Sequence, residues 1–247
     1  MLAEVDAVVF ANAADAATLA ERAVDGAGRP LAADAGWIAP LASTRGQVSI
    51  VAAATPGLRA PRLPIAGAGY ALSLADGAVL CGATTAADDP DPDVRLADHA
   101  HNLRQLAAVT GSALRAEPAP GPADLAGADL RHVAATLVAN GRLHGRVGWR
   151  ATAADRLPLI GALPARPDTE GTALPDQPRH WPRVPGLFVA SGLGSRGLTW
   201  APLAGRLIAA WITGSPYPLA ADLVDALDPA RFATRRVRAS RRPPAAA

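Results

Sequence analysis

The stretch that decides the fold is Gly186-Leu-Phe-Val-Ala-Ser-Gly-Leu-Gly-Ser-Arg-Gly-Leu-Thr199. Its first six residues are apolar or small, which is typical of a strand buried on both faces of a parallel sheet. Residues 192–197 form a G-x-G-x-x-G turn, and a helical stretch follows from Thr199 to Thr213, ending at Gly214. The stretch therefore predicts a strand, a glycine turn and a helix in direct succession.

Three roles are open for the glycine turn. Such a turn can bind a dinucleotide pyrophosphate on the helix N-terminus. Against this, no strand follows to complete a βαβ unit, and Asp222 comes too late in the chain to bind a ribose. The turn could also be purely structural. We favour a third role, in which backbone N–H groups and the positive end of the helix dipole face electron-rich atoms of a cofactor.

The rest of the chain shows two kinds of pattern. Residues 5–11 (VDAVVFA) form a second run of the parallel-sheet type, and a short helix is expected at 16–23. The middle of the chain favours antiparallel strands around Ala75-Asp76-Gly77, which is a hairpin signal. Its expected strands are 47–53, 70–74, 78–83, 133–138 and 147–151, with a helix at 94–109, a connector at 116–128 and a surface loop at 164–185. This order indicates one module split by the insertion of another.

Composition and charge exclude several classes of protein. Half of the 247 residues are hydrophobic, and the single cysteine, Cys81, excludes an intrachain disulfide and is expected in the core. No uncharged apolar stretch reaches the roughly 18 residues of a membrane span, so we expect a cytoplasmic protein. All 24 basic residues are Arg, and six follow Pro229, where there is no acid. The net charge of +2 therefore combines a −4 body with a +6 tail.

Arg150 is the second candidate for chemistry. An Arg on a strand of an otherwise apolar block suits bidentate binding of a planar carboxylate. The alternative is a structural ion pair with Asp155 or a neighbouring acid. No metal site is expected, because His99 and His101 are two residues apart on a helix, and residues 89–93 lack the glycine and glutamate of a calcium loop.

Together these motifs resemble the superfamily of D-amino-acid oxidase, glycine oxidase and sarcosine oxidase, whose members are FAD-dependent. Within it, the chain is most similar to the oxidoreductase half of bacterial bifunctional enzymes that modify the tRNA wobble uridine. The residues that carry the resemblance are Arg45-Gly-Gln-Val48, Cys81-Gly-Ala83, Arg150–Pro158 with Gly161, Gly192–Leu198, Ala201-Pro-Leu203 and Asp228-Pro-Ala-Arg231.

The resemblance implies an α/β plus α+β fold. A discontinuous, Rossmann-like FAD-binding domain would contain an inserted substrate domain with an antiparallel sheet. The expected divisions are 1–45 and 183–236 for the FAD-binding domain, 46–182 for the substrate domain, and 237–247 for a basic disordered tail. The superfamily begins with its own strand, G-x-G-x-x-G turn and helix, which has no counterpart before Val5, so we expect a fragment with an incomplete FAD-binding domain.

The resemblance also implies a cofactor, partners and site residues. The residues expected beside the isoalloxazine ring of FAD are Gly192, Leu193, Gly194, Ser195, Arg196, Gly197, Leu198 and Thr199. Arg150 would bind the carboxylate of carboxymethylaminomethyluridine in tRNA, glyoxylate would be released, and O2 would reoxidise the flavin. Two alternatives stay open. One is a free amino-acid oxidase of the glycine or sarcosine type, and the other is a non-catalytic remnant or module whose Arg tail binds RNA.

Overall fold

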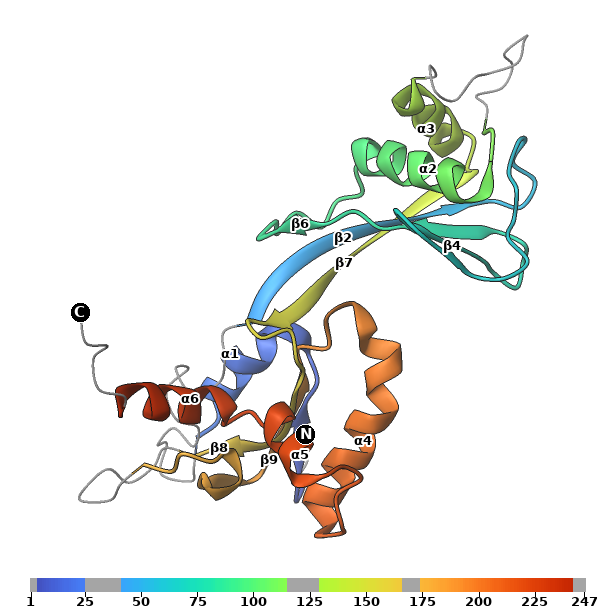
Figure 1. The fold of residues 1–247 in the computed structure, drawn as a ribbon. Coiled ribbons are helices and arrows are strands. Elements are labelled where there is room, and N and C mark those ends of the chain that lie inside the picture. Colours follow the sequence, from blue (N-terminus) through green and yellow to red (C-terminus); the bar gives the residue numbers. More distant parts are fainter. Residues whose placement is uncertain (1–3, 25–40, 115–128, 166–173, 242–247) are drawn as a thin grey trace, which may run out of the picture. The chain divides into compact units, whose positions relative to one another are not determined.

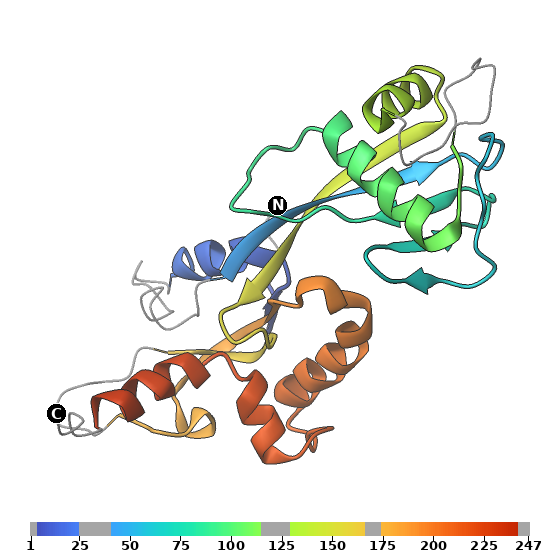
Figure 2. The same ribbon diagram turned by 45° about the horizontal axis from the view of Figure 1, so that its top comes forward.

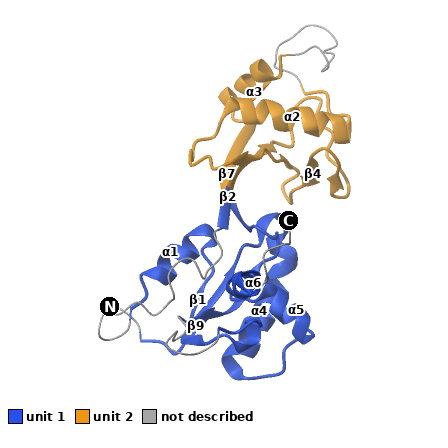
Figure 3. Ribbon diagram, turned by 60° about the vertical axis from the view of Figure 1, so that its left-hand side comes forward, with its two compact units in different colours: residues 1–43, 150–247 blue, residues 44–149 orange. Residues whose placement is uncertain are grey.

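The computed structural model describes residues 4–24, 41–114, 129–165 and 174–241 (Figure 1). The chain forms two compact units, of which unit 1 comprises residues 1–43 and 150–247, and unit 2 comprises residues 44–149 (Figure 3). Within the described ranges, no helix is both long enough and apolar enough to cross a membrane.

Unit 1 is built on a sheet with the strand order β1–β9–β8, formed by Val8–Phe10, Arg183–Ser191 and Leu159–Pro164. The two strands predicted to be of the parallel type, β1 and β9, pair in parallel, whereas β8 is antiparallel to β9. The expected burial of β1 on both faces is wrong. Val8 and Val9 are 38% and 40% exposed, since β9 is the neighbour of β1 in the described sheet.

The glycine turn leads directly into the longest helix of unit 1. A 3-10 turn at Gly194–Arg196 joins β9 to α4 (Gly197–Thr213), which ends at Gly214 in a left-handed conformation. Buried Ala204, Leu207 and Ile208 on α4 pack with Ile160 and Phe188 of the sheet. The predicted succession of strand, turn and helix is thus confirmed, and apolar burial against the sheet stabilises it.

The other helices of unit 1 are short. They are α1 (Ala16–Glu21), α5 (Ala221–Leu227) and α6 (Arg231–Ser240), with 3-10 turns at Ala13–Asp15 and Pro178–His180. The prediction of a disordered tail from residue 237 is wrong at its start. Helix α6 continues to Ser240 because Val237 packs with Trp181, Ala230 and Ala233. The tail residues 242–247 lie outside the described residues.

Unit 2 contains most of an antiparallel sheet with the strand order β3–β4–β5–β2–β6, and β7 also pairs with β2. In chain order these strands are β2 (Leu41–Val51), β3 (Ile65–Ala66), β4 (Tyr70–Ser73), β5 (Val79–Gly82), β6 (Ala86–Ala87) and β7 (Leu143–Ala153). The predicted hairpin is confirmed: β4 and β5 pair antiparallel, and Asp76 accepts a hydrogen bond from the Ala78 N–H in the turn.

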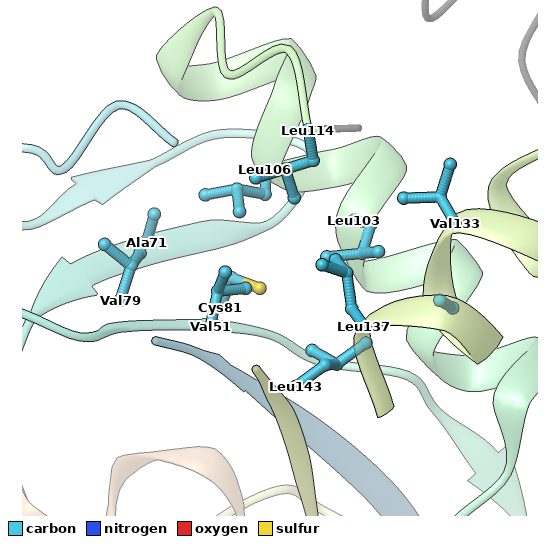
Figure 4. Close-up of a cluster of buried hydrophobic side chains, with 11 residues drawn as sticks. Val51, Ala71, Val79, Cys81, Leu103, Leu106, Leu114, Val133, Leu137 and Leu143 are labelled. Atoms are coloured by element: carbon cyan, nitrogen blue, oxygen red, sulfur yellow. The ribbon is translucent and has the colours of Figure 1, made fainter. Parts of the chain in front are cut away.

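Two helices, α2 (Leu96–Thr110) and α3 (Leu130–Ala139), lie on one face of this sheet (Figure 2). The core beneath them includes Leu103 and Leu106 of α2, Leu137 of α3, and Cys81 of β5 (Figure 4). Burial raises the pKa of the Cys81 thiol to about 12. Cys81 is therefore the small core residue that the sequence predicts, and not a nucleophile.

The expected strand at 133–138 is wrong, because this segment belongs to α3. The buried residues Leu130, Val133, Ala134 and Leu137 follow helical spacing and cover one face. The Asp129 side chain accepts hydrogen bonds from the N–H groups of Arg131 and His132, which caps the helix N-terminus. Val133, Thr136 and Val138 are β-branched and favour a strand when residues 133–138 are considered without Leu130 and the other residues before them. The expected connector at 116–128 lies outside the described residues.

The divisions between the units differ from the predicted ones at one place. The first lies between residues 43 and 44, close to the expected 45/46, but the second lies at 149/150 and not at 182/183. The reason is β8, which pairs with β9 from Leu159 to Pro164 and so belongs to unit 1. Within the expected loop at 164–185, the described part contains Pro178–His180 as a 3-10 turn and the start of β9 at Arg183.

Candidate functional site

The glycine turn after β9 requires its first two glycines. Gly192 and Gly194 have φ values of +69° and +56°, a region that favours glycine. A Cβ on Gly192 would also lie only 3.2 Å from Cδ2 of Leu41. Ser191 fixes the start of the turn, because its hydroxyl donates a hydrogen bond of 2.7 Å to the Ala13 carbonyl. The turn is therefore held in place by its own backbone geometry and by neighbouring chain.

The N-terminus of α4 that follows this turn is open. No side chain caps it within the described structure, and a Cβ on Gly197 would meet no described atom within 4 Å. Leu198 is 96% exposed, and Ser195, Arg196 and Thr199 are also exposed. A helix N-terminus has unpaired N–H groups and a partial positive charge. This end of α4 therefore presents hydrogen-bond donors beside an apolar side chain.

The end of β7 lies against the same turn. Thr152 forms an antiparallel bridge with Leu193, and a Cβ on Gly194 would lie 3.5 Å from Oγ1 of Thr152. Arg150 is two residues earlier on β7, so it shares a face of the strand with Thr152. Its side chain is partly buried. The structure thus brings the strand of Arg150 to the glycine turn within unit 1.

Sequence reasoning missed Thr152 and Leu41 as neighbours of the turn. Thr152 carried a usable signal, because a residue two positions from Arg150 on a strand lies on the same face. Leu41 carried none, since it is far from Gly192 in the sequence and only the fold brings them together.

Asp155, two residues after the end of β7, has two arginine partners on α6. The Arg231 guanidinium donates hydrogen bonds of 2.8 and 2.9 Å to it, and Arg235 donates one of 2.7 Å. Burial alone would raise the pKa of Asp155, but the hydrogen bonds and charge of Arg231, with those of Arg235, lower it to about 2. Both carboxylate oxygens of Asp155 accept hydrogen bonds from these arginines. Asp155 therefore forms structural ion pairs with Arg231 and Arg235 of α6.

The histidines predicted not to bind metal lie in different environments. His101 is exposed, whereas His99 is buried with its Nδ1 2.7 Å from Oγ of Ser49. The Asn102 amide also donates a hydrogen bond of 3.0 Å to the same Oγ, so Ser49 links α2 to β2 through both side chains. Burial lowers the pKa of His99, and its neutral form fits this network. The part of the chain that the structure describes contains no cluster of three or more metal-binding side chains.

Arg45, one of the residues of the resemblance, has a structural role in unit 2. It is 1% exposed and donates to the carbonyls of Asp91 and Asp93 and, at 2.7 Å, to the carboxylate of Asp98. Arg95 binds the carboxylates of Asp89 and Asp91. Within the acidic run at 88–93, Asp89 and Asp91 therefore pair with Arg95, and Arg45 holds the run through its backbone carbonyls.

Comparison with known families decides the class of the protein. The model of the DAO family, described as FAD dependent oxidoreductase, matches residues 2–211. The chain belongs to this family. It is therefore an oxidoreductase-family chain, and FAD is the cofactor of the family.

Curated relatives refine the assignment within the DAO family. The chain is 47% identical over 208 residues to the tRNA 5-methylaminomethyl-2-thiouridine biosynthesis bifunctional protein MnmC of Methylibium petroleiphilum, a match that covers 81% of this chain and 28% of that protein. Its identity to the protein of the same name from Burkholderia orbicola is 40% over 246 residues, covering 97% and 32%. The chain thus spans about a third of the length of these relatives.

Solved structures share the fold of this DAO-family chain. Glycine oxidase from Geobacillus kaustophilus matches with a TM-score of 0.56 and 19% identity, over 90% of this chain and 44% of that one. Iminodiacetate oxidase from Chelativorans sp. BNC1 matches with a TM-score of 0.54 and 20% identity, over 92% and 47%. The expected α/β class, with an FAD-binding fold represented in part, is confirmed.

The open end of α4 fits the isoalloxazine part of FAD. This group is flat, apolar on its faces and electron-rich along its N1 and C2=O edge. The site offers uncapped N–H donors, the exposed side chain of Leu198 and, at Gly197, a position without a side chain. Its donors and its apolar surface therefore match the two chemical requirements of the ring system.

Proposed function

We propose that this DAO-family chain contributes the flavin-facing turn and the substrate-carboxylate site of an oxidoreductase that modifies the wobble uridine of tRNA. The observation that carries the proposal is the bridge between Thr152 and Leu193, which joins the strand of Arg150 to the turn at 192–197. Support for the tRNA substrate comes from the curated relatives, which are named for the biosynthesis of 5-methylaminomethyl-2-thiouridine.

In this proposal, residues 192–199 hold the flavin. The first N–H groups of α4 would hold the electron-rich edge of the ring, and the helix dipole would stabilise negative charge there. Leu198 contributes an apolar surface, and Gly197 leaves room for close approach. FAD, when bound, supplies the hydride-accepting chemistry, and the protein supplies orientation and electrostatics.

Arg150 orients the substrate in this proposal. Its guanidinium binds the carboxylate of the carboxymethylaminomethyl group, which fixes the methylene between the amine and the carboxylate. Loss of a hydride from this methylene and of a proton from the nitrogen gives an imine. Water hydrolyses the imine to glyoxylate and the aminomethyl nucleoside, and O2 is the final electron acceptor. The thiouridine ring and the rest of the tRNA take no part in this balance.

The test uses the purified chain with FAD and tRNA that carries carboxymethylaminomethyluridine. We expect equal amounts of glyoxylate and of aminomethyluridine, measured by liquid chromatography and mass spectrometry. Turnover of glycine or sarcosine without a change in the tRNA nucleosides would contradict the proposal and support a free amino-acid oxidase. Bound FAD is followed separately by its absorbance, so that loss of cofactor is distinguished from loss of chemistry.

The role of Arg150 is tested by Arg150→Leu. Breaking a buried charge pair costs about 2–5 kcal/mol, so we expect kcat/KM for the carboxylated nucleoside to fall by at least about 30-fold. Arg104→Leu is the control, because Arg104 is an exposed residue of α2 in unit 2. Equal kcat/KM in the two variants would remove Arg150 from the substrate site.

A further inference from the structure

Helix α6 presents three arginines on one face. Arg235 is 49% exposed, and Arg236 and Arg238 are also exposed. At about 100° per residue, these three positions span roughly 160° of the helix surface. The opposite side carries Ala233 and Val237, which are buried against Trp181. The helix is therefore amphipathic, and its cationic face points away from the core of unit 1.

Unit 1 fixes α6 firmly in this orientation. Arg231, in the first turn, is 2% exposed and binds Asp155 together with the carbonyls of Leu157 and Pro158. The Phe232 ring lies 4.5 Å from the guanidinium of Arg231 and 5.0 Å from that of Arg235. These contacts order the base of the helix, so little conformational entropy is lost when its exposed face binds a partner.

Four aspartates around α6 pair with arginines. Asp155 is shared between Arg231 and Arg235, and Asp176 lies 3.6 Å from Arg241 at the end of the helix. Asp225 of the neighbouring α5 binds Arg179, and buried Asp228 binds Arg183. After Asp228 the sequence contains six Arg and no acid. The segment after Asp228 thus carries a formal charge of +6, and three of its arginines are exposed on one face of α6.

We propose that the face formed by Arg235, Arg236 and Arg238 binds the phosphate backbone of RNA, and this inference rests on the proposed tRNA substrate. Guanidinium groups bind phosphate through two parallel hydrogen bonds, and a row of them along one helix face matches a row of phosphates. A membrane surface fits less well, because an amphipathic helix binds lipid through its apolar face, and that face of α6 is buried in unit 1. An acidic protein partner is an outcome that the experiment separates.

The experiment compares three forms of the full chain: wild type, the triple variant Arg235→Gln/Arg236→Gln/Arg238→Gln, and the control Arg62→Gln/Arg104→Gln/Arg131→Gln. The control removes the same charge from exposed positions of unit 2. Arg231 is left intact in all three. The probe is a fluorescently labelled, unmodified tRNA transcript, titrated at NaCl concentrations between 0.05 and 0.2 M, about the range in which phosphate contacts dominate the salt dependence.

We expect the triple variant to bind tRNA at least about tenfold more weakly than wild type at 0.1 M NaCl, and the control to change by less than about threefold. The slope of log Kd against log salt should become shallower by about 2 to 3, since each lost phosphate contact removes roughly 0.7–0.9. Circular dichroism checks that α6 keeps its helical signal. Equal weakening in both variants would show an effect of net charge alone and overturn the proposal.

Three further outcomes are decisive. Unchanged tRNA binding in the triple variant, or salt-independent binding in wild type, would overturn the inference. Competition by polyglutamate but not by an RNA duplex would point to an acidic protein partner and also overturn the inference.

Oxidation of the free carboxymethylaminomethyl nucleoside separates this inference from the proposed function. The triple variant should retain this oxidation activity, whereas failure of the proposed chemistry would abolish the activity in wild type as well.

Discussion

Two polar segments of the chain, the aspartate-rich loop at 88–95 in unit 2 and the glycine turn at 192–197 in unit 1, differ in how their hydrogen-bonding groups are satisfied. In the aspartate-rich loop, Arg45 binds the carbonyls of Asp91 and Asp93, and Trp149 donates to the Asp89 carbonyl at 2.8 Å. The loop thus satisfies its polar groups with partners from its own unit.

The glycine turn lacks such partners at its helix end. The N-terminus of α4 has no side-chain cap in the described structure, and Leu198 beside it is 96% exposed. Because this end of α4 is exposed, its N–H groups and the Leu198 side chain are accessible to a ligand. The difference separates a loop that arginines and a tryptophan of its own unit hold in place from a turn whose donors are accessible to a ligand. Four predictions test this comparison.

The largest effect is expected for Arg45→Met. Removal of a buried guanidinium leaves the Asp98 carboxylate and two loop carbonyls without their partner, so the free energy of unfolding of unit 2 should fall by about 3–5 kcal/mol. Urea denaturation followed by circular dichroism measures this loss. Arg104→Met, at an exposed position, should cost less than about 0.5 kcal/mol. A loss below about 1 kcal/mol for Arg45→Met would mean that the loop is not held by this residue.

The second prediction concerns Asp155, which links β7 to α6. Its pKa falls from 3.8 to about 2 in the folded chain, so its contribution is present above pH 4 and is lost as the pH falls toward 2. The contribution is about 2 kcal/mol. Asp155→Asn should remove this part of the acid sensitivity of unfolding, and Asp222→Asn, at an exposed position of α5, should not. Identical acid profiles for wild type and Asp155→Asn would contradict the assignment.

The third prediction compares two glycines of the turn. Gly194→Ala places a side chain at a φ of +56° and should reduce the free energy of unfolding by about 1 kcal/mol. Gly197→Ala lies at the first position of α4 with a φ of −54° and no described atom within 4 Å of the new Cβ, so it should not destabilise the chain. Equal losses of stability in thermal unfolding would contradict the assignment of the difference between the two variants to backbone conformation.

The smallest effect on stability is expected for Leu198→Asp, with a change below about 0.5 kcal/mol because the side chain is already exposed. Its carboxylate would occupy the positive end of α4 and compete with the electron-rich edge of the flavin. We expect FAD to bind about fivefold more weakly, corresponding to roughly 1 kcal/mol, when titrated by flavin fluorescence. Leu198→Asn is the neutral control. Equal FAD affinities of the Leu198→Asp and Leu198→Asn variants would show that the helix dipole does not contribute to flavin binding.

The sequence predicts well wherever a local rule is sufficient. The turn at Asp76 and the succession of β9, glycine turn and α4 follow from residues close in the chain, and Cys81 follows from its apolar neighbours. The sequence predicts the candidate site as two separate motifs, because no local pattern indicates that Thr152 bridges Leu193.

Predictions from the sequence fail where residues far apart in the chain determine the local structure. Val133 and Val138 favour a strand locally, but the buried face that Val133 shares with Leu130 and Leu137 selects the helix α3. The basic C-terminal segment resembles a solvated tail until Trp181 covers Val237 and Asp155 binds Arg231. Segment 159–164 becomes β8 because β9 offers it a partner.

By itself, the sequence determined the positions that need glycine, the signals that start and end the helices, and the motifs of an FAD-dependent family, since each depends on backbone conformation or on neighbouring residues. The tertiary structure alone decided which arginines are buried and which are exposed: Arg45 and Arg231 are buried among carbonyls and carboxylates, whereas Arg235, Arg236 and Arg238 of α6 are exposed. The physical reason is that a buried charge must be compensated by partners, and the carboxylates that pair with Arg45 and Arg231 lie 53 and 76 residues away in the chain.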